Sequence, residues 1–322
     1  MKRVLAVMVA LATLTVSATA QAVVGPENLT RLLDAVHAPA PGGVWANTND
    51  GTPPIYTVTP DSQVCRQDVI AEGPNAARLQ PMWLRVPLPC DFQPAPGSDR
   101  EAVVVNRTGD GGPDYYEFWS MVKDDQGRWH SYYGGSRRDA EFATFMGNRV
   151  WPDFGGVQAS GYAFVPGIVT QADLAAGKIR HPVHLLVPYS CPTFHAPANR
   201  TDAVSAGAPA NPGCIEYGTI FRFPKNFKIN QLNLPPVPRM IAVAARDYGG
   251  LVVSDQTHSA VGVRFQGLGG GPDPYYSPGG YFGCDGLVNG SPVAPGGAEP
   301  DCWFTTYGIM ARFPWEALRV VN

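Results

Sequence analysis

The chain has few charged side chains for a folded protein of its length. Asp, Glu, Lys and Arg together make up 16% of its 322 residues, and the formal net charge is −3 at pH 7. Proteins that bind nucleic acid neutralise phosphates with a surplus of Lys and Arg, so we expect no nucleic-acid partner. Hydrophobic residues make up 44% of the chain, a share too high for an intrinsically disordered protein.

Long apolar runs are missing beyond the N-terminus. Val4–Val16 is the longest run, and it is shorter than the roughly 20 residues that span a bilayer. It follows two basic residues and precedes the small-x-small sequence Ala18-Thr19-Ala20, an order typical of a secretory signal peptide. We therefore predict that residues 1–20 are a signal peptide and that the mature protein is secreted, with no membrane association after cleavage.

The familiar signatures of metal and cofactor enzymes are absent. The sequence has no GxSxG, HExxH or P-loop motif, and no GxGxxG follows an expected strand. His181 and His184 have the spacing of a metal pair, but Pro182 between them would start a strand, on which they would point to opposite faces. The turn at Asp110–Asp114 lacks the alternating ligands of a calcium loop. We therefore expect neither a metal nor a cofactor.

All six cysteines follow the expected signal peptide. An even number of cysteines in an exported chain predicts disulfides, and the sequence has no CxxC or CxxH pair to suggest a metal site instead. Of the fifteen possible connectivities, pairing in sequence order closes the shortest loops and costs the least entropy. We predict the bridges Cys65–Cys90, Cys191–Cys214 and Cys284–Cys302.

Glycine and proline are abundant, at 36 and 32 residues, which indicates many turns and few long helices. Short runs rich in β-branched and aromatic residues recur between the turns and predict strands. These runs are Trp83–Val86, Ala102–Val105, Tyr116–Val122, Arg128–Tyr133, Val183–Val187, Thr219–Phe223, Leu251–Ser254 and Val261–Phe265, with an edge strand at Phe313–Trp315. Helical spacing and capping signals predict helices at Leu29–His37, Gln171–Ala176 and Pro236–Tyr248.

These elements together predict a mostly β fold, namely a jelly-roll-like β-sandwich with a few short packed helices. Residues 21–55 would form an N-terminal helix and a connection. Residues 56–322 would form a single sandwich domain, because no linker composition or internal repeat divides them.

Aromatic side chains are concentrated in residues 114–164, which hold 13 of the 34 in the chain. Flat rings pack well against the C–H bonds of sugars, so exposed rings would bind carbohydrate, whereas buried rings would build the core. We select Trp119, Trp129 and Tyr132 as candidate sugar platforms.

A hairpin turn at Asp124–Gly127 would bring part of this region together. If Lys123 faces Arg128 across the turn, one face carries Glu117, Trp119, His130 and Tyr132. A carboxylate beside a Trp ring in an apolar cleft has a raised pKa, as a general acid at a glycosidic oxygen needs. Alternatively, the neighbouring His or Tyr would act as the base of a lyase on a uronic-acid polymer. Glu117 and His130 are therefore candidate catalytic residues.

Glycoside hydrolysis usually needs a second carboxylate. The candidates are Asp114, Asp139, Glu141, Asp153 and Asp255. His181 is a further candidate catalytic residue. Arg138 would bind an acidic sugar through bidentate contacts, unless it belongs to a surface turn with a local ion pair.

Several motifs between Asp99 and Gly267 resemble a group of secreted, β-rich bacterial proteins, largely actinobacterial and of uncharacterised activity. The motifs are Asp99-Arg100-Glu101, Tyr116-Glu117-Phe118-Trp119, Val165-Pro166-Gly167-Ile168-Val169, Ala175-Ala176-Gly177-Lys178-Ile179-Arg180-His181, Gly218-Thr219-Ile220-Phe221-Arg222-Phe223 and Asp247–Asp255. In that group the first motif usually reads Asp-Arg-His and the last contains Ala-Asp-Asn-Gly, so Glu101 and Gln256 depart from the pattern. The resemblance implies a β-rich extracellular protein and marks Glu117, His181 and Asp255 as positions to test.

We therefore predict a secreted protein that acts on a polysaccharide or cell-wall glycan and cleaves it by acid/base carboxylate chemistry, as a hydrolase or a lyase. The alternative is a non-catalytic glycan- or wall-binding module, in which the same aromatic rings serve but no acid/base pair converges. A third reading is a structural secreted protein whose aromatic residues all belong to the core.

Overall fold

The computed structural model describes most of the chain beyond residue 25. The described residues are 26–39, 43–48, 51–137, 156–203, 213–257, 259–270, 272–276, 280–282, 287–288, 291–292, 309–310 and 312–321. The predicted signal peptide, Arg138 and the predicted Cys284–Cys302 bridge lie outside them. Among the described residues, no helix is long and apolar enough to cross a membrane.

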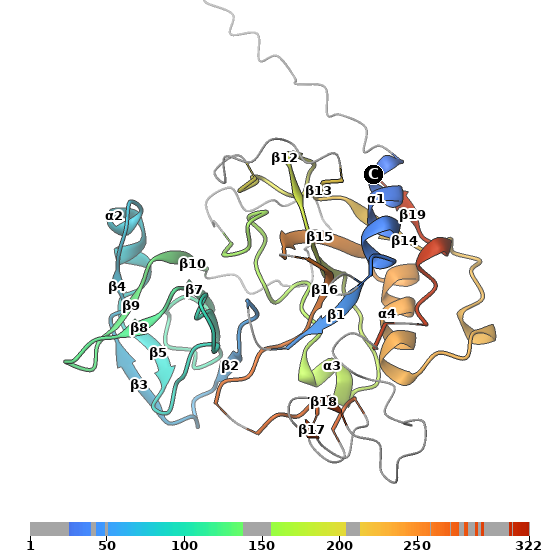
Figure 1. Ribbon diagram of the computed structural model, residues 1–322. Coiled ribbons are helices and arrows are strands. Elements are labelled where there is room, and N and C mark those ends of the chain that lie inside the picture. The colour runs from blue at the N-terminus through green and yellow to red at the C-terminus, as the bar shows by residue number, and fades with distance from the viewer. Residues whose placement is uncertain are drawn as a thin grey trace, which may run out of the picture.

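The larger sheet has six strands and mixed direction. Across the sheet the strands are β1 (Val44–Asn47), β16 (Val261–Arg264), β11 (Val183–Val187), β15 (Leu251–Gln256), β14 (Ile220–Arg222) and β19 (Arg319–Val321). The pairs β1–β16 and β11–β15 are parallel, and the other pairs are antiparallel. Helices α1 (Glu27–Val36) and α4 (Pro236–Asp247) cover the face that points away from the smaller sheet (Figure 1).

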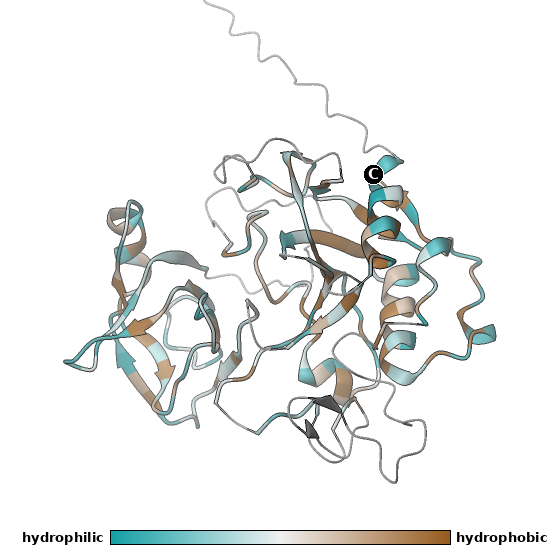
Figure 2. Cartoon of the chain, viewed as in Figure 1, coloured by the Kyte–Doolittle hydropathy of each residue, from teal (hydrophilic) through white to brown (hydrophobic). Residues whose placement is uncertain are grey.

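The two faces of the larger sheet differ in polarity because side chains alternate along each strand. The face under the helices is apolar and fully buried; it carries Val44, Ala46, Val183, Leu185, Val187, Leu251, Val253, Val261 and Val263. Figure 2 shows the hydrophobic character of β15 and the mixed, amphipathic surface of α4 that packs over this layer. The opposite face carries polar side chains, including Asn47, His184 and Arg264, although these are also buried.

The smaller sheet has four strands and a separate interior. Its order is β10 (Tyr133–Arg137), β7 (Tyr115–Trp119), β6 (Ala102–Asn106) and β2 (Ile55–Val58). One face packs on a second hydrophobic core with the short strands around it: β3 (Val64–Gln67), β4 (Ile70–Ala71), β5 (Val86–Pro89), β8 (Val122–Lys123) and β9 (Trp129–Ser131). Its other face carries Val103, Val105 and Tyr115, which pack against Phe164 and Ile168. Residues 157–168 therefore lie against the face of the smaller sheet opposite its own core.

The remaining elements are short. They are α2 (Ala76–Leu79), α3 (Gln171–Ala175), the 3₁₀ turns η1 (Gln80–Met82), η3 (Ile229–Gln231) and η5 (Trp315–Ala317), and the strands β12 (Ser190–Phe194), β13 (Ile215–Tyr217), β17 (Leu287–Val288) and β18 (Ser291–Pro292).

The predicted fold class is confirmed at the level of a mostly β protein with a few short helices, but a sandwich is not confirmed. Five strand pairs among the described residues are parallel, and parallel neighbours require crossover connections instead of the hairpins of a jelly roll. The predicted edge strand at Phe313–Trp315 is wrong in position. That segment enters η5, and the edge strand is β19, which pairs with β14.

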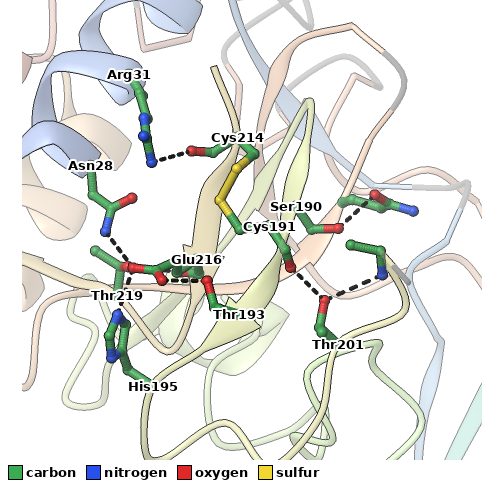
Figure 3. Close-up of a disulfide and its surroundings, with 12 residues drawn as sticks. Asn28, Arg31, Ser190, Cys191, Thr193, His195, Thr201, Cys214, Glu216 and Thr219 are labelled. Atoms are coloured by element: carbon green, nitrogen blue, oxygen red, sulfur yellow. Dashed lines mark hydrogen bonds and ion pairs between the residues drawn. A yellow bond between two sulfur atoms is a disulfide. The ribbon is translucent and has the colours of Figure 1, made fainter. Parts of the chain in front are cut away.

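Two of the predicted disulfides are present in the described part of the chain. Cys65–Cys90 joins β3 to the residue after its antiparallel partner β5, and Cys191–Cys214 joins β12 to the residue before β13 (Figure 3). Glu216 on β13 lies beside the second bridge, where it accepts a hydrogen bond from Asn28 of α1 and contacts Nε2 of His195 at 2.6 Å. These contacts fasten the N-terminal helix to the two-stranded sheet of β12 and β13.

Helix α3 begins with a capping box, as the sequence predicts. The hydroxyl of Thr170 accepts a hydrogen bond from the Asp173 backbone N–H, and the Asp173 carboxylate accepts one from the Thr170 N–H. We expect Thr170→Ala to lower the free energy of unfolding by about 1 kcal/mol, as measured by urea denaturation. Thr170→Ser keeps the hydroxyl and serves as the control; equal stability of the alanine variant and the wild type would contradict the role of this cap.

Candidate functional site

Two connected hollows lie between the larger and the smaller sheet, with volumes of about 340 and 640 Å³. Both are lined by Asp99, Glu101, Asp255 and Gln256. The first, which we call the polar hollow, is also bordered by Trp45, Asn47 and Arg264. The second, which we call the aromatic hollow, is bordered by Trp119, Tyr132, Tyr133, Arg200 and Asp202. We call the two together the acidic cleft, since carboxylates occupy their junction.

The residues before β6 place two acidic side chains at this junction. Asp99 and Glu101 are separated by Arg100, whose φ of 46° lies in the left-handed region. Ser120, which follows β7, has a φ of 58°, and its N–H donates to the Asp99 carbonyl at 2.7 Å. Such backbone conformations are costly for residues other than glycine and cluster at functional sites. Two of them meet where Asp99 enters the cleft.

The Asp99 carboxylate is held at one oxygen and open at the other. The indole Nε1 of Trp119 donates to Oδ1 at 3.1 Å. Within the described residues, Oδ2 accepts no hydrogen bond, and the side chain is partly exposed. Asp99 can therefore act on a molecule in the cleft while Trp119 keeps it in place.

Glu101 is in a different environment from Asp99. Its side chain is buried, and burial raises the pKa of Glu101 well above its usual range. The positive charge of Arg264 opposes this shift. The nearby carboxyl groups reinforce it; they belong to Asp99, Asp255 and Glu117. The Oε2 atom of Glu101 has no hydrogen-bond partner among the described residues. Burial thus favours the protonated form of Glu101, which is the form that a general acid needs.

A β-bulge in β15 directs Asp255 toward the cleft. Leu185 of β11 pairs with Val253, but the next residue, Leu186, pairs with Asp255, so Ser254 is an extra residue in β15. Because paired residues point to the same side, Asp255 lies on the face of Leu186, opposite to the apolar face of Val253. A bulge commonly redirects a side chain in this way next to a functional site.

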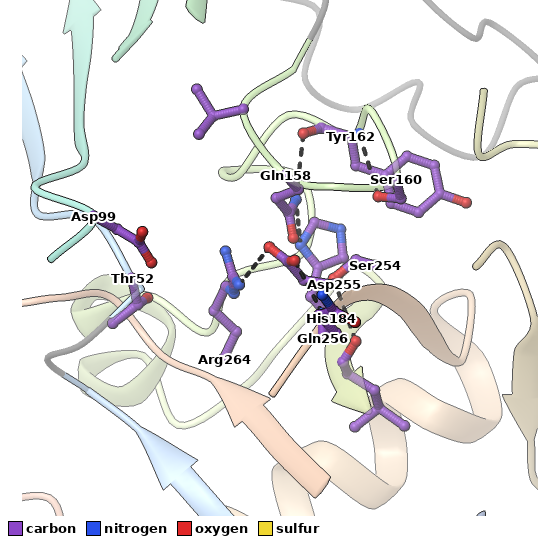
Figure 4. Close-up of polar contacts among 12 residues, drawn as sticks. Thr52, Asp99, Gln158, Ser160, Tyr162, His184, Ser254, Asp255, Gln256 and Arg264 are labelled. Atoms are coloured by element: carbon purple, nitrogen blue, oxygen red, sulfur yellow. Dashed lines mark hydrogen bonds and ion pairs between the residues drawn. The ribbon is translucent and has the colours of Figure 1, made fainter. Parts of the chain in front are cut away.

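Arg264, at the end of β16, neutralises part of this acidic surface. Its Nη2 donates to Asp255 Oδ2 at 2.9 Å, and its guanidinium lies 5.0 Å from the centre of the Phe164 ring. Figure 4 shows this ion pair, with Asp99 pointing toward it from the other wall of the cleft. Burial raises the pKa of Asp255, and Arg264 opposes that shift. Sequence reasoning selected Asp255 but missed Asp99, Glu101 and Arg264 as site residues.

Glu117 does not face the cleft, and its proposed role as a solvent-facing acid is corrected here. The predicted face is right, since Glu117 and Trp119 point away from the core that holds Tyr116 and Phe118. However, residues 157–164 cover the Glu117 side chain, which is fully buried. It accepts hydrogen bonds from the Tyr115 hydroxyl and from the backbone N–H groups of Val157 and Phe164. Glu117 therefore joins this segment to the smaller sheet.

The two histidines selected from the sequence also lie away from the cleft. His130 on β9 contacts Glu72 Oε1 at 2.7 Å and Asp124 Oδ2 at 3.0 Å. The hydrogen bond with Asp124 is the main cause of the raised pKa of His130. His181 contacts Asp173 Oδ2 at 3.0 Å, next to the cap of α3. The structure gives both rings local carboxylate partners instead of a place at the acidic junction.

The predicted hairpin is present, but its register differs by one residue. Lys123 pairs with Trp129 instead of Arg128, and Val122 pairs with His130. Trp119 pairs with Tyr133 in this register, but its ring still meets that of Tyr132, with the ring centres 5.7 Å apart in an edge arrangement. Tyr132 is 42% exposed and lines the aromatic hollow with Trp119.

Of the other residues selected from the sequence, those that the structure describes do not line the cleft. Trp129 is buried against Phe92 in the core of the smaller sheet, so its faces are not available as a sugar platform. Asp114 is half-buried before β7 and does not line either hollow. The candidates Arg138, Asp139, Glu141 and Asp153 lie outside the described residues.

The described residues include no group of three or more His, Cys, Asp or Glu side chains placed to hold a metal ion. Comparison with family models, with curated proteins and with solved structures finds no match to this chain. The sequence does contain a signal for part of the site: Asp99-Arg100-Glu101, Trp119 and Asp255 all belong to motifs of the resemblance above, and the fold brings them into one cleft.

Proposed function

We propose that the protein is a secreted glycan-cleaving enzyme that hydrolyses a glycosidic bond at the junction of the acidic cleft. The observation that carries this proposal is the pair Asp99 and Glu101, two carboxyl groups in contrasting environments beside the half-buried Trp119 and the exposed Tyr132. Glycoside hydrolysis needs such a pair, one to donate a proton and one to act as base or nucleophile. The two disulfides support an oxidising, extracytoplasmic location.

The surroundings of each residue indicate its role in the reaction. Glu101, protonated because it is buried, would donate its proton to the leaving oxygen. Asp99, open at Oδ2, would activate water or attack the sugar carbon. Trp119 would position Asp99 through its Nε1–H and, with Tyr132, provide ring surface for the substrate.

Carboxylate-based hydrolysis is better supported than histidine-based elimination. His130 and His181 are both engaged with carboxylates elsewhere, and no histidine is among the described residues that line the two hollows. A non-catalytic glycan-binding protein would use the same rings but would not need Glu101 to stay protonated.

A screen of plant, algal and bacterial polysaccharides tests this proposal. We expect new reducing ends on at least one polysaccharide, without the ultraviolet absorbance of an unsaturated uronate. Absorbance at that wavelength would indicate a lyase instead, and binding of polysaccharide with no product from any of them would indicate a binding protein.

Glu101→Gln is expected to reduce the rate of cleavage by about a hundredfold, because the amide cannot donate the proton that general-acid catalysis requires. Asp99→Asn is expected to have a comparable effect. The matched control is Asp125→Asn, on the exposed tip of the β8–β9 hairpin. If Glu101→Gln cleaves at the wild-type rate, Glu101 is not the acid.

A further inference from the structure

Several buried polar atoms without a hydrogen-bond partner belong to side chains that line the polar hollow. Among the described residues, they are Trp45 Nε1, Asn47 Oδ1, Glu101 Oε2, and Nε and Nη1 of Arg264. Asn47, Glu101 and Arg264 are each more than nine-tenths buried. Buried polar groups in proteins are nearly always paired. Their concentration around one hollow therefore indicates a surface built to bind a polar ligand.

The strands place these atoms in a fixed array. Trp45 of β1 is paired with Gly262 of β16, and Asn47 is paired with Arg264. A Cβ atom at Gly262 would lie 2.8 Å from Trp45 Nε1 and 3.2 Å from Leu186 Cβ, so only glycine lets the indole lie this close to β16. Four of the five atoms thus come from two adjacent strands, which hold them more rigidly than loops would, and Glu101 supplies the fifth.

The charges and the unpaired N–H donors of the hollow select against ionic ligands. The Arg264 charge is matched by Asp255 at 2.9 Å, and Asp99 adds a further carboxylate, which would repel an anionic sugar. The ammonium group of a cationic sugar has no lone pair to accept hydrogen bonds from the unpaired N–H groups of Trp45 and Arg264. The unpaired atoms comprise N–H donors and oxygen acceptors together, and a sugar hydroxyl, which both donates and accepts, matches such a set.

We propose that the polar hollow is the subsite for one uncharged sugar ring, held through adjacent hydroxyl groups, while the aromatic hollow holds the next ring of the chain. This inference rests on the proposed function, since it places the cleaved bond between the two hollows. It adds the substrate class: a neutral glycan, not a polyuronate or an amine-bearing polymer.

Calorimetric titration of the mature Glu101→Gln protein tests the subsite without turnover and leaves the Asp99 carboxylate in place. The probes are neutral cello-, xylo- and manno-oligosaccharides, with oligogalacturonate and chitosan oligomers as charged comparators. We expect a neutral series to bind at least tenfold more tightly than either charged one. Trp45→Phe, which removes only one N–H donor, and Asn47→Ala should each weaken that binding about tenfold, whereas Asp125→Asn should not change it.

The outcomes separate the two proposals. The subsite is overturned if either charged oligosaccharide binds more tightly than the neutral ones. It is also overturned if Tyr132→Ala abolishes the binding of neutral oligosaccharides while Trp45→Phe leaves that binding intact. Absence of binding by every oligosaccharide also overturns it. If neutral oligosaccharides bind, Trp45→Phe and Asn47→Ala weaken that binding, and the wild type cleaves nothing, the subsite is supported and the hydrolase is refuted.

Discussion

Glu117→Ala is expected to lower the free energy of unfolding by roughly 3 to 5 kcal/mol at pH 5. The Glu117 carboxyl group accepts hydrogen bonds from the Tyr115 hydroxyl and from the backbone N–H groups of Val157 and Phe164. Alanine would leave these buried donors without an acceptor, at a cost of about 1 to 3 kcal/mol for each. Urea denaturation followed by tryptophan fluorescence measures the loss.

Two milder variants serve as controls for this prediction. Tyr115→Phe removes a single donor and should cost about 1 kcal/mol. Glu117→Gln keeps the volume and one acceptor oxygen, so its loss should fall between the two. A Glu117→Ala protein as stable as the wild type would show that residues 157–164 are not held by this carboxyl group.

The same carboxyl group should make stability depend on pH. Burial raises the pKa of Glu117 from 4.5 to about 7, although the bonds from Tyr115, Phe164 and Val157 lower it. Between these two values the folded state keeps a proton that the unfolded chain has released. The stability that Glu117 contributes below pH 4.5 is therefore lost as the pH rises through 7, by on the order of 3 kcal/mol. The difference between the wild type and Glu117→Gln isolates this contribution.

Arg264→Met is expected to destabilise the protein by roughly 2 to 4 kcal/mol at pH 8, because it leaves the half-buried Asp255 without its partner. Glu101 and Glu117 would lose the same favourable charge. At pH 5 these carboxyl groups can take up protons, so the loss should be smaller. Denaturation at both pH values measures the difference.

The double variant Arg264→Met with Asp255→Asn provides the control. Replacing both charges should recover most of the loss, since a buried ion pair contributes little beyond compensating its own desolvation. If the double variant is as unstable as Arg264→Met, the loss comes from packing against Phe164 instead of from an uncompensated charge.

Local sequence signals predicted the three longest helices and the central strands of both sheets, because these depend on short-range physics, but they did not predict β1, β2 or β19. The capping residue Thr170 and the glycine at 177 bound α3, and the apolar run Val183–Val187 is β11. The arrangement of strands was not predictable in the same way. Parallel pairs such as β1–β16 join segments more than two hundred residues apart, and no local pattern encodes such a pairing.

In the candidate site too, local patterns predicted some features, and contacts between distant segments determined the others. The alternation of β7 predicted that Glu117 and Trp119 share a face. It could not predict that residues 157–164 would cover Glu117, because that contact joins distant segments. Asp255 reaches the cleft through a bulge, which a regular period-two strand does not anticipate. Asp99 and Glu101 became candidates only when tertiary packing placed them beside Arg264 and the aromatic rings.

The two walls of the cleft belong to separate hydrophobic interiors, one under each sheet. A change that repacks one interior leaves the other untouched, so the width and lining of the cleft can diverge on one side while the opposite side keeps its shape. Related chains could in this way acquire different ligand preferences through substitutions confined to the smaller sheet. The same independence offers an engineer a route to new selectivity without redesign of the whole molecule.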